Sequence, residues 1–93
     1  MAKPNILEEA LHITTSDRRS QYGNPKMDFE RIAKISTILL GRDISAKDVV
    51  VILIAMKLSR NAYQYKRDTC VDIAGYARVL SILNGEEDEE AKK

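Results

Sequence analysis

The chain has 93 residues, of which 44% are apolar and 31% are charged. This length supports one hydrophobic core but not two, and two prolines with four glycines exclude collagen-like and low-complexity chains. The formal net charge is +1, but without the acidic tail at residues 86–93 the body has 13 basic and nine acidic residues. A moderately basic body suits phosphate-bearing or acidic partners and falls short of the basic stripe of a dedicated DNA-binding protein.

The first two helices are marked by caps and by apolar periodicity. Asn5 and Glu8 have the spacing of a capping box, and apolar residues then recur at helical spacing, which predicts a helix over 6–14. Pro25 suits a first helical turn, and Gly41 suits the left-handed residue that ends a helix. The pattern therefore predicts a second helix over 25–40.

The third helix contains the longest apolar run, Val49 to Met56. Its β-branched residues also suit a buried strand, but Ser45 and Asp48 form a capping box before it and a polar helical pattern follows it. We therefore predict a helix over 46–63 whose middle is buried on nearly all sides. A run of eight residues is too short for a membrane span, which needs about 20.

The fourth helix is predicted over 69–84, because Thr69 and Asp72 form a third candidate capping box and Gly85 a closing residue. The third helix is the only one apolar enough to be central. The expected fold class is all-α: a compact bundle of four helices around that third helix, in a single domain over residues 1–85. We expect residues 86–93, which include the run EEDEE, to be a disordered acidic tail.

Charged residues next to the apolar segment are the first candidate site. Lys57 and Arg60 share one face of the third helix, and Asp68, Asp72 and Tyr76 recur every four residues along the fourth. The short connection predicts antiparallel neighbours, so the two lines should meet. Because a partly buried charge is costly unless paired, they form either a structural ion pair or a polar pocket. In a pocket, the cations would bind phosphate or carboxylate oxygens, and the aspartates would orient a cation or hydroxyl groups.

The segment DRRSQYGNP, residues 17–25, is the second candidate site. Arg18 and Arg19 supply fork-shaped donors for phosphate, and Tyr22 supplies a stacking face. The same side chains also suit an exposed protein-binding patch, and a turn explains the glycine without any ligand. His12 and Cys70 are the sole residues of their types, and we expect both to be inert. A lone cysteine also excludes a disulfide framework and indicates a cytoplasmic protein.

Three motifs carry a resemblance to a known family: D-R-x-x-x-Y-G at 17–23, K-L-x-R at 57–60 and D-I-A-G-Y-A at 72–77. The chain resembles, over about 7–83, a small domain family of unknown function that is common in phages and prophages. More distantly it looks like the MazG-like all-α nucleotide pyrophosphohydrolases. That resemblance implies a helical, oligomeric, magnesium-dependent protein. Those enzymes hold their metal with an E-x-x-E helix, and this sequence has no E-x-x-E before its tail. The resemblance therefore leaves open whether any bond is broken.

These observations favour a small phage-type protein that recognises a nucleotide or another phosphate-bearing small molecule. The expected ligand-binding residues are Arg18, Arg19, Tyr22, Lys57, Arg60 and Tyr76. Asp68 and Asp72 are the candidate ligands of Mg²⁺. One alternative is an accessory protein that binds and modulates a host protein in the host cytoplasm, and another is a nucleic-acid-binding module. Four short helices give a thin core, so we expect a homodimer or a higher homo-oligomer.

Overall fold

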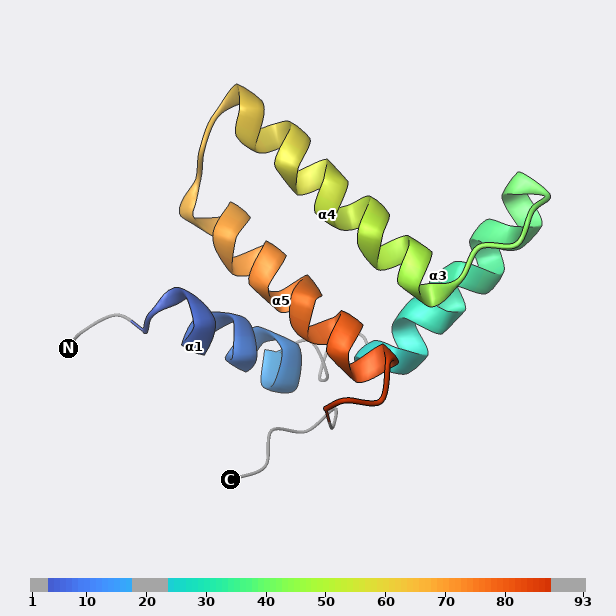
Figure 1. Ribbon diagram of the computed structural model, residues 1–93, viewed down its shortest axis with the longest axis horizontal. Helices are drawn as coiled ribbons and strands as arrows, with labels where there is room; N and C mark the ends of the chain where they lie inside the picture. The colour runs from blue at the N-terminus through green and yellow to red at the C-terminus, as the bar shows by residue number, and fades with distance from the viewer. Residues whose placement is uncertain (1–3, 18–23, 88–93) are drawn as a thin grey trace.

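The computed structural model describes residues 4–17 and 24–87 of the chain (Figure 1). In chain order its elements are α1 (Ile6–His12), the π-helical turn η1 (Ile13–Asp17), α3 (Pro25–Leu40), α4 (Ala46–Tyr63) and α5 (Arg67–Leu83). The described residues form helices and no strands, which confirms the all-α fold class. The bounds of α3 and α4 match the predicted ones. None of these helices has the length and apolarity that crossing a membrane requires.

The predicted caps explain where the helices begin. The Asn5 side chain accepts from the amide of Glu8 at 2.8 Å, and the Glu8 carboxylate accepts from the amide of Asn5 at 2.9 Å. Ser45 and Asp48 exchange the same two bonds at 3.0 Å each. Such a cap contributes about 1 kcal/mol, because it satisfies amides that have no partner inside the helix. Gly41 ends α3 with φ of 72°, a left-handed conformation that favours glycine.

The helix at the centre of the bundle is α5, and not α4 as the sequence suggested. Helix α5 packs against α1 on one side and α4 on the other, and it also contacts α3, whereas α4 packs against α3 and α5. The small residue Gly75 is the physical reason: it lets α1 and η1 approach α5 closely. A Cβ atom there would lie 3.3 Å from Cγ2 of Thr14.

The main core lies where α3, α4 and α5 meet. Phe29 on α3, Val50 on α4 and Val79 on α5 are almost fully buried. The ring of Phe29 also meets the ring of Tyr76 edge to face, with centroids 6.4 Å apart. The side of α5 that carries Tyr76 therefore faces Phe29 and this core.

A separate set of contacts holds α1 against the start of α5. The guanidinium of Arg67 pairs with the Glu9 carboxylate and donates a second hydrogen bond to the carbonyl oxygen of Pro4 at 2.9 Å. Ala10, a residue of α1, is buried. The N-terminal helix is therefore tied to the end of α5 that follows the α4–α5 connection.

The outer face of α4 differs from the expectation that its middle is buried on nearly all sides. Val51, Ile52 and Leu58 are each more than half exposed, although Val49 and Val50 are buried. The prediction counted apolar residues along the helix, but among the described elements α4 packs against α3 and α5 alone, which leaves this face uncovered. At the other end of the chain, the Glu87 carboxylate pairs with Nε of Arg78 at 2.6 Å. The rest of the predicted acidic tail, residues 88–93, lies outside the described residues.

Candidate functional site

An ion pair joins the two helices at the predicted meeting point. Nζ of Lys57 on α4 lies 2.6 Å from Oδ2 of Asp72 on α5. The Lys57 side chain is 18% exposed and that of Asp72 is 32% exposed, so both charges are partly removed from water. Pairing offsets much of that desolvation cost. The antiparallel placement of the two helices, inferred from the short connection, is confirmed.

An open cavity of about 570 Å³ lies beyond this ion pair, at the end where α4 connects to α5. We call it the basic cavity. Its lining residues are Lys57, Ser59, Arg60, Tyr63, Gln64, Lys66, Asp68 and Thr69. Three of them are cations and one is a carboxylate. Lys57 is already paired with Asp72, but Arg60 and Lys66 form no ion pair with a described residue. The lining is therefore suited to an anion.

The start of α5 opens into the basic cavity. Lys66 is the N-cap residue, and no side chain caps the helix there. The predicted capping box of Thr69 and Asp72 is wrong, because α5 begins two residues earlier and Asp72 pairs with Lys57 instead. The first amide groups of the helix thus lack a side-chain acceptor, and that of Thr69 donates to the carbonyl oxygen of Lys66 at 2.9 Å. Together with the helix dipole, they favour negative charge near Asp68 and Thr69, which line the cavity.

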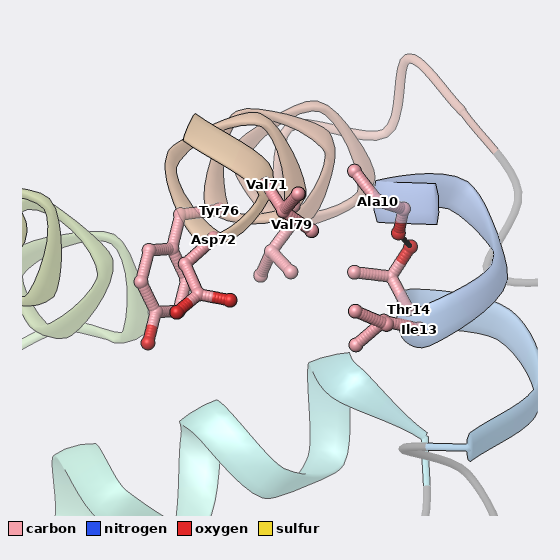
Figure 2. A pocket seen from close by; sticks show the side chains of 8 residues that line it. Ala10, Ile13, Thr14, Val71, Asp72, Tyr76 and Val79 are labelled. Atoms are coloured by element: carbon pink, nitrogen blue, oxygen red, sulfur yellow. Dashed lines mark hydrogen bonds between the residues drawn. The ribbon is translucent and has the colours of Figure 1, made fainter. Parts of the chain in front are cut away.

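A second, smaller cavity of about 50 Å³ lies between α1, η1 and α5 (Figure 2). Asp72 and Tyr76 border it from α5, and Ile13 and Thr14 border it from the opposite side. The Thr14 hydroxyl donates to the carbonyl of Ala10 at 2.8 Å. This space suits a few waters and is too small for a nucleotide, since ligand cavities span about 300–1,000 Å³.

The predicted site residues therefore divide between two cavities. Lys57, Arg60 and Asp68 line the basic cavity, while Asp72 and Tyr76 line the small one. The residues of the second candidate site, Arg18, Arg19 and Tyr22, lie outside the described residues.

The two aspartates do not converge on one point, and an ammonium group already occupies Oδ2 of Asp72. Within residues 4–17 and 24–87 no three His, Cys, Asp or Glu side chains cluster as metal ligands would. A Mg²⁺ ion needs several converging oxygens. The described residues therefore do not fit the magnesium site that the sequence suggested.

Sequence reasoning missed Lys66, which the structure places on the wall of the basic cavity. The available signal was its position in the short connection between α4 and α5, because a residue there lies next to a cavity at that end of the two helices. The nearby Tyr65 has a different contact: its hydroxyl donates to Sγ of Cys70 at 3.6 Å. That hydrogen bond raises the pKa of Tyr65 above its ordinary value.

The Lys57–Asp72 ion pair should couple the two helices energetically. We expect Lys57→Met to lower the free energy of unfolding by about 1–2 kcal/mol, because it leaves a half-buried carboxylate unpaired. Asp72→Leu alone should also destabilise the protein, and the double variant should be more stable than the sum of the two losses predicts. Urea unfolding of all four proteins measures this coupling. A coupling below about 0.3 kcal/mol would mean that the ion pair is energetically irrelevant.

Comparison with known proteins places the chain in a family. Residues 5–84 match the family described as a domain of unknown function, DUF6378. The chain is 38% identical over 91 residues to the Gene 55 protein of Mycobacterium phage L5, covering 96% of this chain and 58% of that protein. It is 39% identical over 74 residues to the Gene 55 protein of Mycobacterium phage D29, covering 78% of this chain and 49% of that protein. The chain thus spans about half the length of these curated relatives.

No solved structure matches the chain. The matches support a small phage-type domain, as its motifs suggested, and they do not extend to the MazG-like enzymes. Since the family match covers most of the sequence, the chain belongs to the DUF6378 family of domains of unknown function.

Proposed function

We propose that the basic cavity binds the phosphate groups of a nucleotide. The observation that carries this proposal is the joint presence, around one open cavity, of an uncapped helix start and of two cations that have no ion-pair partner among the described residues, Arg60 and Lys66. An arginine fork and a lysine ammonium bind phosphate oxygens by charge-assisted hydrogen bonds. The amides of Arg67 and Asp68, at the start of α5, add donors for the same anion.

The size of the cavity and one aromatic side chain favour a nucleotide over a bare anion. A volume of about 570 Å³ lies within the range of cavities that enclose small organic ligands. Tyr63 lines the cavity and is 94% exposed, so its ring is free to stack on a base. The proposal concerns binding alone, because the described carboxylates do not converge as a hydrolytic metal centre requires.

A thermal-shift panel tests this proposal. A nucleoside triphosphate at 100 times its dissociation constant should stabilise the protein by about 2.7 kcal/mol, which raises the melting temperature of a domain this size by roughly 10 °C or more. Arg60→Ala should remove most of that shift, and Lys66→Ala should reduce it. Lys34→Ala removes an exposed cation from α3, outside the cavity, and is the matched control.

Comparing ligands separates the phosphate contacts from the base contacts. Tyr63→Ala should weaken the binding of a nucleoside triphosphate and leave the binding of inorganic triphosphate unchanged. No stabilisation by any nucleotide, or an equal shift in Arg60→Ala, would refute the proposal. A strongly salt-dependent interaction with duplex DNA, without a nucleotide shift, would instead favour the nucleic-acid alternative.

A further inference from the structure

The outer face of α4 carries an aliphatic stripe that no part of the described chain covers. The stripe consists of Val51, Ala55, Leu58 and Ala62, all of them exposed. Val51 is 56% exposed and Leu58 is 55% exposed, and the adjacent Ile52 is 57% exposed. Scattered exposed aliphatic residues are ordinary, but a continuous row along one helix marks an interaction surface.

The spacing of the stripe is that of a helix–helix seam. Its members are separated by four, three and four residues, which is the repeat of alternating a and d positions in a coiled coil. No ionisable side chain belongs to the stripe. The opposite face of α4, with Val49 and Val50, is the one packed into the core. One helix thus has two apolar faces and only one of them has a partner among the described residues.

The order of residue sizes along the stripe identifies what covers it. Large and small residues alternate: Val51, then Ala55, then Leu58, then Ala62. In an antiparallel pair of two α4 helices, a and d positions lie opposite each other, so Val51 faces Ala62 of the other copy and Ala55 faces Leu58. Every layer then joins one large residue to one alanine, and a two-fold axis between Ala55 and Leu58 relates all the layers.

The amount of exposed apolar surface also matches a second copy. Seven aliphatic side chains of α3 and α4 are more than half exposed: Ile35, Ile38, Leu39, Leu40, Val51, Ile52 and Leu58. Together they present on the order of 700 Å² of apolar surface over two helices that contact each other, against the roughly 800 Å² that each partner of a standard interface buries. We propose that the chain forms a homodimer through an antiparallel α4–α4 seam made by this stripe.

Mass measurement and one charge substitution give the first test. Analytical ultracentrifugation of the full chain at tens of micromolar should give twice the 10.5 kDa mass of one chain. Leu58→Glu should give the mass of a single chain while far-ultraviolet circular dichroism keeps its helical signal, because a carboxylate cannot be buried unpaired in the seam. Ala77→Glu places the same charge on an exposed position of α5 and should leave the dimer intact.

Cysteine cross-linking tests the direction of the helices. In a Cys70→Ser background, Val51→Cys combined with Ala62→Cys should give a disulfide-linked dimer on a non-reducing gel. The two cysteines of one chain cannot bridge each other, since eleven residues of helix separate them by about 16 Å. Val51→Cys alone should not cross-link, because the two copies of residue 51 lie far apart in an antiparallel pair.

Three results would overturn the proposal. A monomer at all concentrations would mean that the stripe has another occupant, such as a further segment of a longer protein or a different partner. A dimer that survives Leu58→Glu would place the interface away from the α4 stripe. Cross-linking by Val51→Cys alone would show parallel helices. None of these readouts depends on nucleotide binding, so the dimer and the basic cavity stand or fall separately.

Discussion

Phe29→Ala should lower the free energy of unfolding by roughly 3–5 kcal/mol, because Phe29 is fully buried where three helices meet. The change leaves a cavity that the backbone of α3 cannot fill, and it removes the edge-to-face contact with Tyr76. A domain of this length has a total stability of about 5–14 kcal/mol, so the loss is a large part of it. Urea unfolding followed by circular dichroism at 222 nm measures it.

Met27→Ala is the matched control for this change. Met27 lies on the same helix but is 57% exposed, so its truncation should cost less than about 0.5 kcal/mol. If Phe29→Ala lost no more stability than Met27→Ala, the core would not be centred on this residue. A changed slope of the denaturant dependence would indicate instead that the variant alters the unfolded or native ensemble.

Gly75→Val should lower the free energy of unfolding by about 2–3 kcal/mol, which is less than the loss expected for Phe29→Ala. Even a single Cβ at this position would meet Cγ2 of Thr14 at 3.3 Å, and the two methyl groups of valine cannot fit without moving η1 away from α5. Gly75→Ala is the graded control. Its mild crowding is offset by the better helix propensity of alanine, worth about 1 kcal/mol, so its stability should stay close to that of the original protein.

A second substitution shows whether crowding is the cause. Thr14→Ser removes the crowding methyl group and keeps the hydroxyl that donates to the Ala10 carbonyl. Gly75→Ala should therefore be more favourable in the Thr14→Ser background than in the original chain. Equal effects in both backgrounds, or a Gly75→Val protein as stable as Gly75→Ala, would show that α1 and η1 do not pack tightly on this part of α5.

The helix starts that sequence could predict are those decided by local chemistry. Asn5 with Glu8 and Ser45 with Asp48 form their capping boxes from residues three positions apart, so no tertiary contact is needed. The box predicted at Thr69 failed because a distant residue competed for the carboxylate of Asp72. Lys57 pairs with it across the helix interface, and that competition is invisible in a local window.

The central helix was harder to predict because apolarity and burial are different properties. Helix α4 is the most apolar, yet Val51 and Leu58 are exposed and α5 occupies the centre. The property that puts α5 there is the close approach allowed by Gly75, a packing effect that periodicity does not report. The same excess of apolar residues on α4 carries the inference of a second copy, as the sequence alone had suggested.

The candidate site was predictable in part. Helical spacing and a short connection were enough to bring Lys57 to Asp72 and to place Arg60 beside them. They were not enough to show that Asp68 and Asp72 line separate cavities, because that depends on how the two helices are rotated about their axes.

A nucleotide titration followed by nuclear magnetic resonance tests the central claim most directly. Adding ATP to the ¹⁵N-labelled protein should produce saturable shifts in backbone amides that cluster at residues 57–69, around the basic cavity. Amides at the far end of α3, residues 34–40, should stay unchanged. Shifts that never saturate, or a saturable set centred on any other part of the chain, would contradict the assignment of the basic cavity as a nucleotide site.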